Sequence, residues 1–380
     1  MIVGVPRETA PGERRVALIP ETAEKLVRSG VGVMVERGAG DRAFHADDAY
    51  TKAGATIAGA AVELYSKSDL VLHARRPELE VLEMLREGIV LVAPLQPLSN
   101  PDVVQRLAQR RVTAFSTDAI PRIARAQSLD VLSSMASVAG YAAALTAARS
   151  LPKFFPLLMT AAGTLTPARV FVIGAGVAGL QAIATARRLG AVVEAFDTRP
   201  VVKEQVQSLG ATFVEAALGV AETEDKGGYA KELSEDAHRR ELELVASRAR
   251  EADVVITTAL IPGKRAPLLI TADTVRAMRP GSVIVDLAGE QGGNCELSRP
   301  GETVVEHGVT IHAPLDLVSS MPVHASQMLS RNHAALLQLL IKDGKLTLNF
   351  DDEIIRDACI THEGKIVSDR VRAVVEGGSA

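Results

Sequence analysis

The chain is 380 residues long, more than a typical single domain, and this length predicts two domains that each bury a core. Apolar residues make up 47% of the chain and aromatic residues only 3%, so Ala, Val, Leu and Ile must build the core, as in parallel α/β sheets. The formal net charge is −4 and basic residues are interspersed with acids, which excludes an extended nucleic-acid-binding surface and a polybasic membrane anchor.

The first 130 residues alternate between strand and helix patterns. The apolar runs predict strands at 1–5, 31–36, 70–74, 89–95 and 112–116, and the amphipathic segments predict helices at 19–29, 47–53, 79–86 and 100–110. Alternation of this kind predicts a parallel sheet covered by helices on both faces. The N-terminus enters a strand directly, without the basic and apolar regions of a signal peptide, so we expect a cytoplasmic location.

The longest uncharged stretch, 131–148, is rich in Ala, Ser and Gly. Its hydrophobicity is low for a membrane-spanning helix, and we expect a buried helix between two domains and no direct membrane insertion.

A glycine fingerprint follows at the centre of the chain. An apolar run at 170–173 leads into Gly174, Gly176 and Gly179, then into a helix that ends before Gly190 and a second strand that ends at Asp197. In a dinucleotide-binding unit the first glycine permits the tight turn, the second lets the backbone approach a pyrophosphate, and the third lets helix and strand pack closely. The strand before and the acid after the motif make a plain turn the weaker interpretation.

The residue at the end of the second strand indicates which nucleotide is bound. The carboxylate of Asp197 is placed to accept hydrogen bonds from a ribose and repels a ribose 2′-phosphate, which favours NAD over NADP. Arg199, two residues later, is expected to lie over the adenine or to point to solvent.

The alternation then resumes and closes a second domain. We expect helices at 202–209, 231–250 and 271–278, strands at 211–214, 253–258 and 282–287, a further long helix at 328–341, and short strands in the tail at 346–374. The predicted fold class is α/β, with two doubly wound Rossmann-like domains of mostly parallel sheets, separated by a cleft and joined by two long helices. The predicted boundaries give a discontinuous first domain of 1–130 and 318–380 and a nucleotide-binding domain of 131–317.

Polar groups just after strands are the candidates for chemistry, because ligands of open α/β sheets bind at the carboxyl ends of the strands. The densest segment, PRIARAQSLDVLSS at 121–134, contains Arg122, Gln127, Asp130 and Ser133. It is interpreted either as a site or as a capped helix start with solvated arginines. Four other arginines, namely Arg14, Arg15, Arg75 and Arg76, are candidates to hold a carboxylate substrate or are solvated surface.

No metal site is predicted. Cys295 and Cys359 lie far apart in the sequence, which gives no disulfide framework. His362 follows Cys359 closely, but a zinc site needs three or four ligands and no second pair accompanies this one.

Several segments together resemble one family. The chain is similar to the NAD(H)-binding alpha subunit, or domain I, of the proton-translocating nicotinamide nucleotide transhydrogenases, a family related to alanine dehydrogenase. The segments that carry this resemblance are PGERRVALIP, PRIARAQSLDVLSS, MTAAGT, GAGVAGLQAIATARRLGA, KEQV, GGYAKE, TTALIPGK and GGNC.

The resemblance implies a peripheral, homodimeric subunit that binds NAD(H) and docks membrane-embedded partner subunits, one of which binds NADP(H). It assigns the nicotinamide end and the approach to the second nucleotide to Arg122, Gln127, Asp130 and Ser133. Nucleotide contacts carry over onto Gly174, Gly176, Val177, Gly179, Asp197, Thr198, Arg199, Gly228, Tyr229 and Leu260, with 227–229 in a mobile loop.

Two alternative functions are also considered. An alanine dehydrogenase-like or opine-type amino-acid dehydrogenase needs a proton acceptor, and this chain has Arg75 and Gln96 where related dehydrogenases place a Lys and a His. Neither guanidinium nor amide titrates near neutral pH, which argues against that reaction. A redox-sensing NADH-binding module is the alternative outside enzymes.

Overall fold

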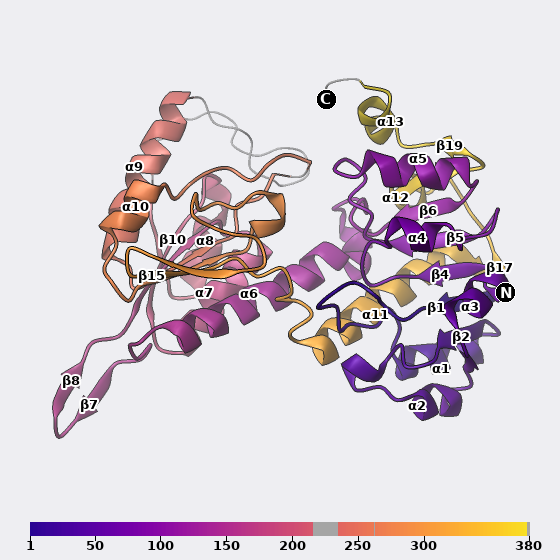
Figure 1. Cartoon of the computed structure of the whole chain (residues 1–380), viewed down its shortest axis with the longest axis horizontal. Helices are drawn as coiled ribbons and strands as arrows, with labels where there is room; N and C mark the ends of the chain where they lie inside the picture. The colour runs from indigo at the N-terminus through magenta and orange to yellow at the C-terminus, as the bar shows by residue number, and fades with distance from the viewer. Residues whose placement is uncertain (216–234, 262, 378–380) are drawn as a thin grey trace. The chain divides into compact units, whose positions relative to one another are not determined.

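The computed structural model describes residues 1–215, 235–261 and 263–377, which divide into two compact units (Figure 1). The first unit is discontinuous and consists of Met1–Met135 and Ser319–Ala380, and the second is Ala136–Val318. The predicted fold class is confirmed, because both units are mixed α/β structures built on a parallel-dominated sheet.

The first unit contains an eight-stranded sheet in the order β19-β18-β6-β5-β4-β1-β2-β3. Its parallel strands are β1 (Ile2–Val5), β2 (Gly32–Glu36), β3 (Thr56–Ala58), β4 (Leu70–Leu72), β5 (Val90–Ala93) and β6 (Thr113–Ser116). Taken alone, these six follow the 3-2-1-4-5-6 order of a Rossmann fold. The strand–helix pair at β3 and α3 (Ala61–Lys67) was not predicted from the sequence.

Alternate residues of each strand enter two separate cores, as the two-residue period of a strand requires. Leu70 and Leu72 pack in one core, whereas Val71 between them packs in the other. The first core is covered by α1 (Pro20–Arg28), α2 (Asp47–Lys52), α11 (Pro322–Leu340) and α12 (Glu353–Ala358). The second core is covered by α3, α4 (Leu79–Leu82), α5 (Pro101–Gln109) and α13 (Asp369–Val375).

The C-terminal segment completes this unit. β18 (Cys359–His362) lies antiparallel to β6 and continues the sheet to β19 (Lys365–Ile366), while a small hairpin joins β16 (Ile341–Lys342) to β17 (Lys345–Leu346). The prediction of short strands alone in this tail was incomplete, because α12 and α13 flank them. The preceding helix, α11, begins at Pro322 and not at 328, since proline is well suited to the first helical position.

The second unit contains a seven-stranded sheet in the order β11-β10-β9-β12-β13-β15-β14. Its strands are β9 (Arg169–Ile173), β10 (Val192–Phe196), β11 (Thr212–Phe213), β12 (Val254–Thr257), β13 (Val283–Asp286), β15 (Val309–His312) and the antiparallel edge strand β14 (Thr303–Glu306). Its helices are α7 (Val177–Arg188), α8 (Lys203–Ser208), α9 (Glu235–Glu251) and α10 (Ala272–Ala277), with 3-10 turns η3 (Pro200–Val202) and η4 (Gly289–Gln291). The parallel strands again follow the 3-2-1-4-5-6 order.

Two further elements flank this sheet. A hairpin of β7 (Leu158–Thr160) and β8 (Gly163–Leu165) extends away from it in Figure 1. The helix α6 (Val131–Ser150) begins in the first unit and continues into the second. Among the described residues it alone has the length and apolar composition of a membrane span, criteria that buried core helices also meet. Of its apolar 18-residue window, 44% is buried.

Candidate functional site

The glycine turn after β9 is shaped by close backbone contacts. Gly174 has a φ of +91°, which side-chain-bearing residues rarely adopt, and a Cβ there would lie 2.6 Å from Thr258 Oγ1. A Cβ at Gly179 would lie 1.8 Å from the carbonyl oxygen of Gly174. Both positions therefore require glycine if α7 is to pack against β9 and β12.

The middle glycine has a different environment. Among the described residues, the only atom within 4 Å of a Cβ built at Gly176 is Arg199 Nη2, at 3.9 Å. Gly176 is the N-cap of α7, no side chain caps this helix, and its first turn carries no acid. An exposed helix N-terminus next to open space suits an anion such as the pyrophosphate of a dinucleotide.

The strand-end carboxylate of Asp197 already has several donors. Its Oδ2 accepts hydrogen bonds from Ala175 N and Arg199 Nη2, both at 2.7 Å, and its Oδ1 accepts from Arg199 N and Nε at 2.9 and 2.8 Å. The Arg199 side chain is only 13% exposed. The alternative in which Arg199 points to solvent was therefore wrong, because its guanidinium binds the acid two residues earlier.

Next to this pair, the hydroxyl of Thr198 is buried and has no hydrogen-bond partner among the described residues. A buried hydroxyl without a partner is unfavourable. The Thr198 hydroxyl is suited to donate a hydrogen bond to a ligand bound at the end of β10, such as a ribose, or to accept one from it.

The loop after β12 is held by hydrogen bonds to the side-chain amide of Asn294, called here the Asn294 clamp. Asn294 Oδ1 accepts from Ala259 N at 3.1 Å, and its Nδ2 donates to Ala259 O at 2.9 Å and to Pro267 O at 2.8 Å. Leu260, the predicted nucleotide contact in this loop, is 36% exposed. Asn294 thus fixes the backbone beside Leu260, a role that no sequence pattern indicates beyond the presence of a polar residue after a strand.

The backbone N–H of Asn294 is in turn bound by Asp286, a fully buried residue at the end of β13. Its carboxylate accepts hydrogen bonds from five donors, namely Thr257 Oγ1, Ala288 N, Asn294 N, Cys295 N and Ser298 Oγ, at 2.7 to 3.0 Å. A buried carboxylate with this many donors is well compensated. Asp286 therefore organises the loops that follow β12 and β13.

In the first unit, the polar loop forms the 3-10 helix η2 (Ala124–Leu129), followed at once by α6. Asp130 caps α6: its Oδ1 accepts from Ser133 N at 2.8 Å and its Oδ2 from Ser133 Oγ at 2.6 Å. Gln127 and Arg122 are exposed. Asp130 and Ser133 are thus brought together, and Gln127 lies on the surface of the same loop.

Arg15, one of the other candidate arginines, is already paired with a carboxylate. Arg15 Nε and Nη2 bind the carboxylate of Glu13 at 2.8 and 2.6 Å, and Ser319 Oγ donates to the same carboxylate at 2.7 Å. Arg15 holds the pKa of Glu13 at about 2, against the opposing effect of burial. The charge of Arg15 is therefore neutralised by its own loop.

The carboxyl ends of β1 and β4, where the first sheet reverses its strand order, are filled by side chains. Glu8 Oε1 accepts from Ala74 N at 2.6 Å and lies 3.3 Å from His73 Nδ1, while Tyr65 Oη is 3.0 Å from His73 Nε2. All three side chains are buried. The buried carboxylate of Glu8 disfavours binding of a phosphate at the end of β1. The first sheet therefore differs chemically from the second, in which a glycine turn follows the equivalent strand, β9.

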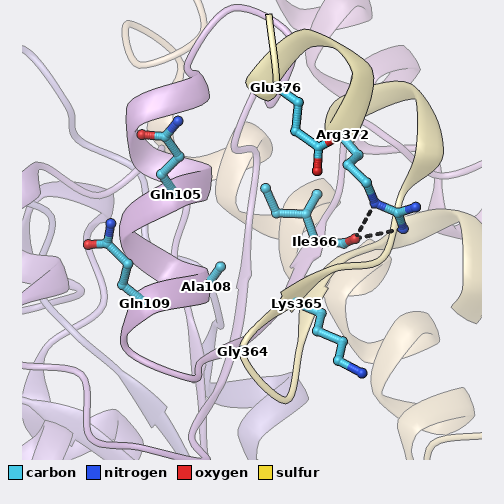
Figure 2. Close-up of a pocket in the computed structure, with 8 residues that line it drawn as sticks. All are labelled: Gln105, Ala108, Gln109, Gly364, Lys365, Ile366, Arg372 and Glu376. Atoms are coloured by element: carbon cyan, nitrogen blue, oxygen red, sulfur yellow. Dashed lines mark hydrogen bonds between the residues drawn. The ribbon is translucent and has the colours of Figure 1, made fainter.

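A surface hollow of about 550 Å³ lies elsewhere in the first unit, between α5, the β18–β19 turn and α13 (Figure 2). Arg372 donates to the Ile366 carbonyl oxygen from Nε and Nη2 at 3.0 and 2.8 Å across its floor. None of the predicted site residues lines it. Gly228 and Tyr229 lie outside the described residues, and no group of three metal-ligating side chains occurs among those that are described.

Family profiles cover almost the whole chain. Residues 4–139 match the family described as "Alanine dehydrogenase/PNT, N-terminal domain", and residues 143–369 match "Alanine dehydrogenase/PNT, C-terminal domain". The chain belongs to the alanine dehydrogenase/PNT family. The resemblance inferred from the sequence motifs is thereby confirmed at the level of the family.

Among the members compared, a transhydrogenase subunit is more similar to this chain than an alanine dehydrogenase is. The chain is 47% identical to an NAD(P) transhydrogenase subunit alpha chain of Rhodospirillum rubrum, over 97% of this chain and 98% of that one. It is 29% identical to alanine dehydrogenase of Mycolicibacterium smegmatis, over 98% and 96%. The crystal structure of a transhydrogenase from Sinorhizobium meliloti superposes with a TM-score of 0.84 at 40% identity, covering 97% of this chain and 100% of that one.

Proposed function

We propose that this chain is the NAD(H)-binding peripheral subunit of a proton-translocating transhydrogenase. In this function it passes hydride directly between NAD(H) on this chain and NADP(H) on a partner subunit. The observation that carries the proposal is the full-length match to a transhydrogenase alpha subunit at 47% identity, against 29% for an alanine dehydrogenase of similar coverage.

The second unit supplies the nucleotide site in this proposal. The N-terminus of α7 at Gly176 and Val177 holds the pyrophosphate, and Asp197 and Thr198 face the ribose. Leu260, fixed by the Asn294 clamp, contacts the nucleotide from the loop after β12. The bound dinucleotide supplies a hydride carrier, and these residues bind and orient it. Gly174, Gly179 and Arg199 shape the site, and Gly228 and Tyr229 complete it.

The polar loop of the first unit acts on the reacting end. Arg122, Asp130 and Ser133 orient the nicotinamide, and Gln127 reaches toward the second nucleotide. Direct hydride exchange needs orientation and exclusion of water but no titrating base, which agrees with the residue types present. The amino-acid dehydrogenase alternative is disfavoured because Arg15 is neutralised by Glu13 and because neither Arg75 nor Gln96 acts as a base.

The proposal extends to assembly. The chain forms a homodimer and associates with membrane-embedded subunits, one of which carries NADP(H), so that it lies on the cytoplasmic side of the membrane as a peripheral protein. Matches to chains named as alpha subunits support this assignment.

One set of assays tests the function. The purified chain is expected to bind NADH more tightly than NADPH in equilibrium titration and to reduce no 2-oxo acid on its own. Mixed with the NADP(H)-binding subunit of the same system, it is expected to transfer hydride from NADH to an oxidised NADP analogue. Turnover of a 2-amino or 2-oxo acid without a partner would instead establish an amino-acid dehydrogenase, and tight NADH binding without either reaction would indicate a sensor.

A further inference from the structure

The 3-10 helix η2 presents its side chains in three rows, because residues three apart are eclipsed in this kind of helix. Ala126 and Leu129 form one row and are buried in the core of the first unit. Arg125 and Ser128 form the second row. Gln127 belongs to the third, which Asp130 continues at the start of α6.

The second row is tied to the C-terminal segment by a two-pronged ion pair. Arg125 Nη1 lies 2.7 Å from Asp352 Oδ2, and Arg125 Nη2 lies 2.7 Å from Asp352 Oδ1. Paired N–H···O bonds of this kind fix orientation as well as distance. Arg125 lowers the pKa of Asp352 to about 2, so the carboxylate stays charged at every pH at which the protein is handled.

Asp352 is itself immobilised. Its Oδ1 accepts from Ile354 N at 2.9 Å and so caps α12, whose Ile354, Ile355 and Ala358 are buried against the sheet. The strand that follows, β18, is paired with β6. The ion pair therefore connects η2 to a fixed point.

A second tie comes from α11. Asn332, which is 7% exposed, donates from Nδ2 to the carbonyl oxygen of Ser128 at 2.8 Å. The two ties reach η2 at residues 125 and 128, on either side of Gln127. A 3-10 helix of only two turns has weak hydrogen-bond geometry of its own, so its orientation depends on such outside contacts.

We propose that Asp352 and Asn332 are positioning residues for hydride transfer, which hold η2 so that Gln127 is presented in a fixed orientation. The inference rests on the proposed function of Gln127. A shift of about 1 Å in a group that positions reactants can lower a rate on the order of 10²-fold. Loss of a contact that holds η2 beside Gln127 is therefore expected to lower the rate of hydride transfer.

Asp352→Asn tests the proposal with little risk to folding, because asparagine caps a helix as well as aspartate does and can still accept from Ile354 N. We expect this variant to lose on the order of tenfold in reconstituted NADH-to-NADP-analogue transfer, a smaller loss than full misplacement would cause. Its NADH affinity and melting temperature stay close to wild type. Hydrogen exchange of residues 124–130 is expected to become faster.

Arg125 variants and a surface control complete the experiment. Arg125→Gln should match Asp352→Asn, Arg125→Lys should recover part of the rate, and the Arg125→Gln/Asp352→Asn double variant should lose no more than either single variant. Asp357→Asn, which removes an exposed partner of Arg356 on the same helix, should transfer hydride at the wild-type rate. A wild-type rate in Asp352→Asn, or equal losses of rate and NADH affinity, overturns the positioning role. A wild-type chain that transfers no hydride with its partner overturns the proposed function instead.

Discussion

Gln127 is exposed on η2, whereas its neighbours in the loop have structural contacts, since Asp130 caps α6 and Arg125 binds Asp352. Gln127→Asn keeps the amide and shortens the side chain by one methylene. We expect near-normal NADH binding and a transfer rate reduced on the order of 10²-fold, which is the pattern of an interaction made mainly in the transition state. Titration and reconstituted rate on the same variant check this, and an unchanged rate removes Gln127 from the site.

The guanidinium of Arg199 binds the carboxylate of Asp197, which the proposed function places at the ribose, so we expect the two residues to set nucleotide preference together. Asp197→Asn leaves Arg199 without its anion and available to a 2′-phosphate. We expect the ratio of NADPH to NADH dissociation constants to fall by about tenfold or more, since one charge-assisted hydrogen bond contributes roughly 1.5–3 kcal/mol. Arg199→Ala is the control and should retain the preference for NADH; an unchanged ratio in Asp197→Asn would show that other residues discriminate.

At the scale of elements, α6 approaches the first turn of α7 through a glycine. A Cβ at Gly140 would lie 2.0 Å from the carbonyl oxygen of Ala178, a backbone atom that cannot rotate away. We expect Gly140→Ala to destabilise the second unit by about 1–3 kcal/mol and to weaken NADH binding, because α7, whose N-terminus is the proposed pyrophosphate site, must shift. Urea unfolding and NADH titration measure both effects. Gly59→Ala, whose added Cβ would meet only Glu63 at 3.7 Å, should be neutral.

Elements with a clear apolar run or apolar periodicity were predictable, whereas some elements without such a pattern were not. The strands flanking the fingerprint and the helices at 20–28 and 101–109 follow from clear apolar periodicity. α12 is only six residues long and contains two adjacent isoleucines, so its pattern resembles a strand, and its cap at Asp352 becomes evident only from the hydrogen bond to Ile354 N. The hairpin of β14 and β15 was also missed, because its residues alternate in burial and lack the continuous apolar run by which the buried strands were identified.

The candidate site was predictable where the backbone dictates residue type. Gly174 and Gly179 are required by a positive φ and by a contact shorter than any side chain allows, and both requirements leave a mark in the sequence. The partners of Arg125 and Asn294 leave none, because these long polar side chains bind acceptors that are brought near only by the tertiary structure. Asp352 lies 227 residues from Arg125, and no spacing rule connects them.

At the scale of the whole molecule, two sheets of the same strand order differ at equivalent positions. The second ends β9 in an open glycine turn, whereas the first closes the equivalent place with Glu8 and His73. The side chains that close the first sheet include buried titratable groups. The first unit also buries His333, which is expected to make the stability of the chain sensitive to acid.

His333 lies on α11. It is fully buried, its Nδ1 donates to Ala17 O at 2.9 Å, and its Nε2 has no partner among the described residues. Burial, with a smaller contribution from Arg15 and His73 and against the hydrogen bond to Ala17 and the charge of Glu8, lowers the pKa of His333 to about 4. Protonation would place a second N–H in the core without an acceptor, so the folded state keeps the ring neutral.

The sign of the effect follows from the two pKa values. Between pH 6.5 and about 4 the unfolded chain binds a proton that the folded chain refuses, so the free energy of unfolding falls as pH falls through this window. The loss attributable to His333 is about 2 kcal/mol between pH 7 and pH 5. His333→Gln, whose amide can still donate to Ala17 O, should remove most of this slope in urea unfolding series. A smaller residual slope is expected from His45, whose pKa burial also lowers. An unchanged slope in His333→Gln would mean that His333 is not the group that titrates.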